Sequence, residues 1–172
     1  MRNLSTLAWR VYDAPTKPWH GVVADTEGDD SVYVMRVERR DGVSQLTLAH
    51  ITPTGTEELA VLEVASAPPH VPDVADFRLL ADGGSSVNHM PAICVIGSGG
   101  DIVLMPVDEE ASAPAEVVGS VDQGILAAAW SPEEDVLVLI TGGEKRLIVM
   151  TREFEVMSET MLSTEAFGDD QP

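Results

Sequence analysis

The sequence contains little cysteine and no long apolar run, and each scarcity excludes a class of protein. Its 172 residues include a single cysteine, Cys94, which excludes an intrachain disulfide framework and a cysteine zinc site and fits a reducing compartment. The run 125–130 is among the longest apolar stretches, far short of the roughly 20 residues that a membrane-spanning helix needs. The first seven residues lack the apolar segment of a signal peptide. We therefore expect no membrane association.

Positive charge is also scarce. Lys and Arg together number 10 against 29 Asp and Glu, which gives a net charge of −19. Residues 1–50 carry 6 basic and 7 acidic groups, whereas residues 51–172 carry 4 and 22. Binding to a phosphate backbone requires a basic surface, so direct nucleic-acid binding is not expected. Two interpretations stay open: a solvated acidic surface that keeps the domain soluble, or an acidic face that binds a basic partner.

What the sequence has in abundance is β-forming apolar residues. The hydrophobic fraction is 44% and the mean hydropathy is +0.06, enough for one domain with a core and against disorder throughout. Almost no segment has helical periodicity, whereas short runs of Val, Ile and Leu recur between turn residues. The predicted strands are 31–38, 45–51, 57–64, 76–80, 92–96, 102–107, 115–119, 125–130, 136–141, 146–151 and 155–160.

Between these strands, composition predicts several connections. Residues 13–30 contain two prolines and two glycines and are expected to be irregular. Three prolines stiffen residues 65–73, while the glycines and serines of residues 82–91 indicate a flexible loop. Residues 108–114 are expected to form an acidic turn. An acidic flexible tail is predicted for residues 165–172.

An internal repeat favours one all-β architecture. Residues 93–105 and 137–150 both consist of an apolar strand, a glycine-containing turn and a second strand that ends in Met. Their offset of 44 to 45 residues matches the spacing of WD-type propeller blades, each of which has four strands. The chain holds about three such blades, and a closed propeller typically has four to eight. We therefore predict an all-β fold of WD-type β-propeller blades forming an incomplete propeller, with residues 1–164 as a partial N-terminal β-propeller.

Patterns that carry chemistry are few. The four histidines lie apart in the sequence and form no H-x-x-x-H or H-E-x-x-H motif. We interpret them as structural or surface residues: His20, His50, His70 and His89. Residues 25–30 place carboxylates at alternate positions, as a calcium loop does, but lack glycine at the sixth position. A solvated acidic loop is the simpler interpretation.

Two glycine-rich segments are candidates for phosphate binding, and one tryptophan is a candidate for a partner contact. Residues 97–100, Gly-Ser-Gly-Gly, follow a predicted strand and are followed by another strand, whereas a phosphate-binding loop requires a helix N-terminus. Residues 142–145 are not expected to bind phosphate either, because a predicted strand follows them as well. Trp130, after three alanines, is predicted to pack in the core, with a partner contact as the alternative. No catalytic, cofactor-binding or metal-binding residue is predicted, no cofactor is implied, and the protein is not expected to be an enzyme.

Particular residues carry a family resemblance. The segment 119–134, GSVDQGILAAAWSPEE, resembles one in the largest subunit of the Elongator complex, the IKAP-type scaffold. The continuation through residues 136–139, 147–150 and 154–159 is also similar to that family, as is the opening Met-Arg-Asn-Leu of residues 1–4. Between about residues 12 and 118, only strand spacing and loop character agree.

The resemblance implies a function. That family has two N-terminal propellers, helical repeats and a C-terminal dimerisation region, and it scaffolds the complex that modifies the wobble uridine of certain transfer RNAs. The chemistry belongs to another subunit. The chain is then expected to be a fragment of this non-catalytic scaffold subunit, from the first blades of the first propeller, without the family's homodimerisation region. Its partners would be other Elongator subunits, in the cytoplasm, with the nucleus as a second compartment. The alternative is a stand-alone acidic β-rich adaptor that binds a basic protein partner.

Overall fold

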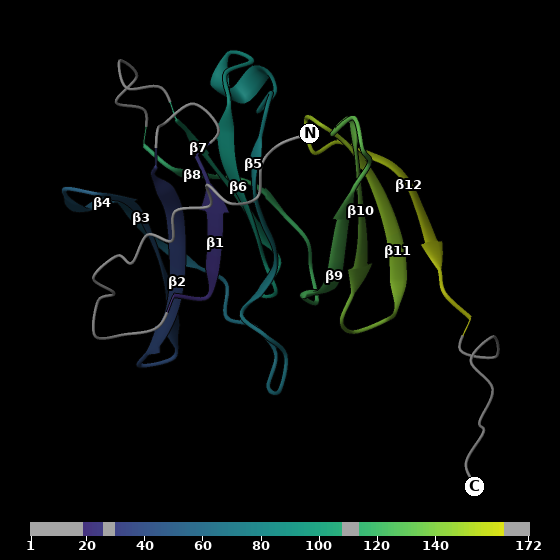
Figure 1. Cartoon of the computed structure of the whole chain (residues 1–172). Coiled ribbons are helices and arrows are strands. Elements are labelled where there is room, and N and C mark those ends of the chain that lie inside the picture. The colour runs from purple at the N-terminus through teal and green to yellow at the C-terminus, as the bar shows by residue number, and fades with distance from the viewer. Residues whose placement is uncertain (1–18, 26–29, 108–113, 164–172) are drawn as a thin grey trace, which may run out of the picture.

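Three four-stranded antiparallel sheets make up the part of the chain that the computed structural model describes, residues 19–25, 30–107 and 114–163. They lie side by side in chain order (Figure 1), with β4 and β12 on opposite sides of the molecule. Each sheet is a β-meander in which consecutive strands pair. This arrangement confirms the predicted all-β fold of three blades in an open, incomplete propeller.

The strand bounds follow the apolar runs of the sequence. The first blade consists of β1 (Gly21–Ala24), β2 (Val32–Arg40), β3 (Val43–Thr52) and β4 (Gly55–Val64). The second consists of β5 (Val74–Leu80), β6 (Ala92–Gly97), β7 (Asp101–Pro106) and β8 (Glu116–Ser120), with the 3₁₀ turn η2 (Ser85–Val87) before β6. The third consists of β9 (Ile125–Trp130), β10 (Val136–Thr141), β11 (Arg146–Thr151) and β12 (Val156–Met161). Within the described residues, no helix is long and apolar enough to cross a membrane.

One strand lies where the sequence predicted an irregular segment. Residues 21–24 form β1, which pairs with β2 in a register that places Gly21 opposite Met35. Gly21 does not form a turn but allows the first blade to approach Phe77 of the second blade closely. A Cβ at this position would lie 2.7 Å from the Phe77 ring. Glycine was therefore a misleading signal, since a tight contact and a turn both favour it.

The repeat found in the sequence corresponds to equivalent hairpins. In the second blade Ile96 pairs with Ile102 across β6 and β7, and in the third blade Ile140 pairs with Leu147 across β10 and β11. These pairs are separated by the same 44 to 45 residues as the repeat. The offset thus reports one structural unit used twice.

The apolar core lies between the blades rather than within one sheet. Successive side chains of β6 point to opposite faces, so Ile93 and Val95 pack toward the first blade while Cys94 and Ile96 pack toward the third. Every residue of β6 up to Ile96 is buried. Burial of apolar surface stabilises a fold by about 25 cal/mol per Å², so both interfaces contribute to stability. The order of the blades therefore depends on the middle one.

Candidate functional site

The predicted structural histidines lie at separate places. His50 stacks on Tyr33 with ring centroids 4.7 Å apart, and His20 Nδ1 accepts a hydrogen bond from the Val37 backbone N–H at 3.2 Å. His70 is exposed in the connection between the first two blades, and His89 lies beside Asp82. Among residues 19–25, 30–107 and 114–163, no group of three His, Cys, Asp or Glu side chains could hold a metal ion.

Cys94 lies in the interface between the second and third blades. Its side chain is fully buried, and this burial raises the pKa of its thiol far above the usual value. Because the thiolate is the reactive form of cysteine, Cys94 behaves as a small apolar core residue. The second-blade side chains that share a face of the sheet with Cys94 pack against aliphatic side chains of the third blade.

The glycine-rich segment 97–100 forms the turn between β6 and β7, as the sequence predicted. Both connections between blades meet at this turn. Ser98 N–H donates to the Asp73 carbonyl at 3.0 Å, and the Ser98 carbonyl accepts from Ile125 N–H at 3.0 Å. A Cβ on Gly99 would lie 1.9 Å from the Ala65 carbonyl oxygen. The glycines thus admit neighbouring backbone rather than a phosphate.

The structure describes only some of the other segments that the sequence analysis singled out. Asp25 accepts a hydrogen bond from Ser31 Oγ at 2.8 Å, whereas residues 26–29 of the calcium-like pattern lie outside the described residues. Trp130 is buried and meets Phe154 edge to face at 6.0 Å, which confirms its predicted core role. Its indole N–H finds no hydrogen-bond acceptor in the described part of the chain. Residues 108–113, the acidic turn, and 165–172, the acidic tail, are also outside it.

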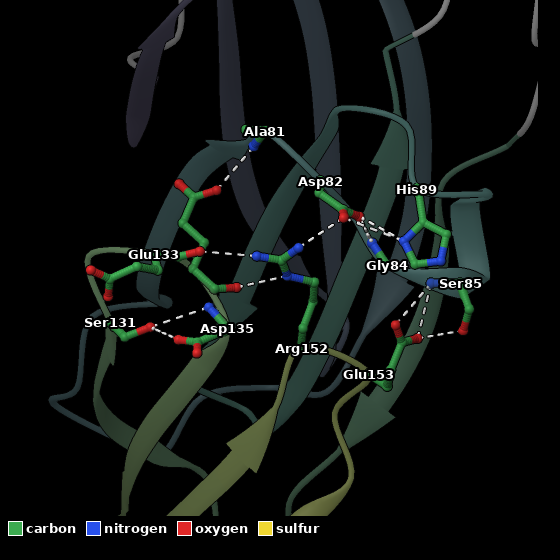
Figure 2. A network of polar contacts seen from close by, with 11 residues as sticks. Ala81, Asp82, Gly84, Ser85, His89, Ser131, Glu133, Asp135, Arg152 and Glu153 are labelled. Carbon is green, nitrogen blue, oxygen red and sulfur yellow. Dashed lines mark hydrogen bonds and ion pairs between the residues drawn. The ribbon is translucent and has the colours of Figure 1, made fainter.

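A polar network joins the second and third blades at one end of the sheets (Figure 2), and we call it the Arg152 junction. Arg152, in the turn after β11, donates from Nη1 to Asp82 Oδ2 at 2.8 Å. The same guanidinium donates from Nε to the Glu134 carbonyl at 2.9 Å and from Nη2 to the Glu133 carbonyl at 3.0 Å. Glu134 in turn accepts from the Ala81 N–H at 3.0 Å. Arg152 therefore ties two turns of its own blade to the loop of the neighbouring blade.

The neighbouring turn residue, Glu153, makes a second link in the Arg152 junction. Its carboxylate accepts from the Ser85 backbone N–H at 3.0 Å and from the Ser85 hydroxyl, at the start of η2. These hydrogen bonds from Ser85 lower the pKa of Glu153. The Gly84 N–H, with smaller contributions from His89 and Arg152, lowers the pKa of Asp82. Both carboxylates are thus stabilised in their charged form at neutral pH.

Sequence reasoning missed the Arg152 junction. Arg152 and Asp82 are 70 residues apart, and nothing local marks either as paired. A usable signal was the scarcity of basic residues in the acidic part of the chain, where Arg152 is one of the 4 after residue 50. In such a segment, each arginine is a candidate for a structural ion pair. The arrangement holds two blades together.

The outward face of the third blade is the other notable surface. β10 alternates between buried and half-buried residues, unlike the fully buried β6. The half-buried positions of β10 and β11, together with two exposed alanines of β9, form an aliphatic surface that we call the open face: Ala127, Ala129, Val136, Val138, Ile140, Leu147 and Val149. In the repeat, Val138 and Ile140 correspond to Cys94 and Ile96, which in the second blade bind the next blade. The open face thus has the composition of a blade-binding surface.

Comparison with known proteins agrees with this architecture. A family model described as the ELP1 first N-terminal beta-propeller matches residues 1–172. The chain is similar to Elongator complex protein 1 of Schizosaccharomyces pombe, with 47% identity over 73 residues that cover 42% of this chain and 6% of that protein. Elongator complex protein 1 of Rattus norvegicus and of Mus musculus is 27% identical over 180 aligned positions, covering 98% of this chain. The chain spans only 12% of the length of these two relatives.

Proposed function

The chain belongs to the family of ELP1 first N-terminal β-propellers, and we propose that it serves an Elongator complex as a non-catalytic scaffold segment. The observation that carries the proposal is the family match over residues 1–172, together with relatives named Elongator complex protein 1. We further propose that this complex acts in transfer-RNA wobble-uridine modification and that a different subunit performs the chemistry.

The described side chains support a scaffold more than an enzyme. The residue types that most often perform nucleophilic or acid–base catalysis are dispersed or inert, since the histidines lie apart and Cys94 is buried with a raised pKa. The polar network at the Arg152 junction connects two blades. The proposed partners are other Elongator subunits, and the proposed location is the cytoplasm, with the nucleus as a second compartment.

Affinity purification from the source organism tests the assignment. The endogenous protein is tagged at its N-terminus, and co-purifying proteins are identified by mass spectrometry. We expect the other Elongator subunits to co-purify and wobble-uridine modification to disappear from a null strain. Normal modification in the null strain contradicts the proposal. Recovery of a basic partner without any Elongator subunit supports the stand-alone acidic adaptor instead.

A pair of variants tests whether the open face takes part in this assembly. Val138→Asp places a carboxylate in the middle of the open face, whereas Val117→Asp places one on β8, where Val117 is already 44% exposed. If the open face is covered in the assembled protein, Val138→Asp reduces recovery of the complex at least tenfold, because it buries an unpaired charge. Val117→Asp serves as the control and leaves recovery unchanged. Equal recovery of both variants contradicts a covered open face.

A further inference from the structure

Strand β4 forms a long, exposed edge of the first blade. It is the last strand of its sheet and pairs only with β3 among the described strands. Its ten residues would extend roughly 33 Å at the usual rise of a strand. Its first five residues, from Gly55 to Leu59, are all exposed. In Figure 1, β4 is the outermost strand of the first blade, on the opposite side of the molecule from β12. One row of its backbone N–H and C=O groups therefore faces outward.

This edge lacks some of the devices that usually prevent pairing with another chain, although it carries three glutamates and a register shift at Leu59. The outer strands β8 and β12 have register shifts as well. Proteins protect edge strands with lysine, proline or short length, and β4 contains neither Lys, Arg nor Pro. The other outer strands are less suited to pairing. β8 has only five residues, one of them Gly119, and β12 has six, with Glu159 already paired to Arg146. Of the three outer edges, β4 is the one most open to an added strand.

Charge indicates what kind of strand would pair there. β4 carries Glu57, Glu58 and Glu63, all exposed and without an ion pair to any described residue. Leu59 and Val61 lie among them, 38% and 45% exposed. Opposite charges on neighbouring strands stabilise pairing, and like charges oppose it. Glu57 and Glu58 are adjacent, so their side chains point to opposite faces of the sheet. An added strand that alternates basic and aliphatic residues would pair its basic side chains with the carboxylates on one face and place its aliphatic side chains on the other face.

We infer that the outer edge of β4 binds an extended basic segment of a partner protein by strand addition, antiparallel or parallel to β4. The backbone hydrogen bonds supply affinity and the three glutamates supply selectivity for positive charge. This surface goes beyond the proposed scaffold role. It is measured by direct binding, so its failure leaves the Elongator assignment untouched.

The test uses the 172-residue chain and a defined probe. The probe is the fluorescent seven-residue peptide Lys-Val-Lys-Val-Lys-Val-Lys, with binding measured by anisotropy and located by hydrogen exchange. We expect slower amide exchange in residues 55–64 and no change in β8 or β12. A peptide with proline in place of each valine keeps the charge but cannot form a strand, so we expect at least tenfold weaker binding. Equal binding of both peptides, or protection outside β4, overturns strand addition.

Two matched triple variants test the role of charge. One converts Glu57, Glu58 and Glu63 to Gln on β4, which removes the acidic side chains from both faces of this edge, so we expect about tenfold weaker binding. The control converts three exposed carboxylates elsewhere to Gln: Glu116, Glu144 and Glu155. All six positions are exposed, where substitutions change stability by about 0.5 kcal/mol or less. Equal weakening by both variants shows a non-specific charge effect and overturns the inference.

Discussion

Replacing Arg152 by alanine tests the claim that the Arg152 junction holds the second and third blades together. The substitution removes the donors to the Asp82 carboxylate and to the carbonyls of Glu133 and Glu134, which lie 2.8, 3.0 and 2.9 Å away. It also leaves those acceptors to find water instead. Only the bond to Asp82 crosses between the two blades, because Glu133, Glu134 and Arg152 all belong to the third blade. The substitution therefore removes one polar link between the blades and loosens the turn that carries the Glu134–Ala81 link.

The expected cost follows from these three bonds. The Arg152 side chain is 25% exposed, so its ion pair with Asp82, which is 33% exposed, contributes at most about 1 kcal/mol. Each of the two hydrogen bonds to backbone carbonyls contributes about 1 kcal/mol. Arg152→Ala should therefore lower the free energy of unfolding by about 2–3 kcal/mol, which is roughly a 30- to 150-fold change in the unfolding equilibrium.

Urea denaturation of the wild-type chain and of the variant measures this change. Arg146→Ala is the matched control, because Arg146 is similarly buried at 22% exposed but pairs with Glu159 inside the third blade. That surface pair is expected to contribute less than about 1 kcal/mol. A double-mutant cycle with Asp82→Asn should show a coupling of about 0.5–1 kcal/mol between Asp82 and Arg152.

Two results would refute this reasoning. If Arg152→Ala and Arg146→Ala destabilise the chain equally, the Arg152 junction has no special role between the blades. If the cycle gives no coupling, Arg152 and Asp82 are neighbours without a stabilising interaction. Hydrogen exchange adds a local check, since loss of the Arg152 junction should speed exchange in residues 81–91 before it affects β2 or β3.

Further predictions address packing, close contacts and pH. Gly99→Ala should destabilise the chain by more than 2 kcal/mol in urea denaturation, because its Cβ would overlap the Ala65 carbonyl; an unchanged midpoint would contradict this contact. Leu104→Ala, which opens a cavity between the second and third blades, should cost about 2–5 kcal/mol in the same assay; a cost below 1 kcal/mol would mean that this interface is loosely packed. Asp82 and Glu153 have lowered pKa values in the folded chain, so their contribution to stability is present above their unfolded values of 3.8 and 4.5 and is lost as the pH falls through the folded values. Below about pH 3.8, the Asp82→Asn variant should therefore lose less thermal stability than the wild type; an identical pH dependence would refute it.

Local patterns in the sequence were sufficient to place most of the fold. Strands β2 to β12 all overlap a predicted strand, because alternating or continuous apolar residues and turn residues act over short distances. The repeat at 44 to 45 residues identified the blade as the unit, because equivalent hairpins keep equivalent residues. The short strand β1 was missed because four residues with an initial glycine carry almost no local signal.

Sequence reasoning did not find the candidate site, the Arg152 junction, because its residues are distant in the chain. Scattered histidines and a lone cysteine argued against familiar catalytic and metal motifs, and the described histidines do lie apart. The 3₁₀ turn η2 within the predicted flexible loop was not foreseen, although Val87 in that turn reaches the core. Its position depends on the third blade, because Glu153 receives the Ser85 hydrogen bonds.

The sequence by itself determined the strands, the three blades and the acidic charge, since each of these depends on residue type and spacing. Only the tertiary structure decided which surfaces are shared and which remain open. The partnership of Arg152 with Asp82 and the meeting of both connections at the turn of residues 97–100 join residues that are distant in the chain. The physical reason is that packing and hydrogen bonding depend on distance in space, which local composition does not encode.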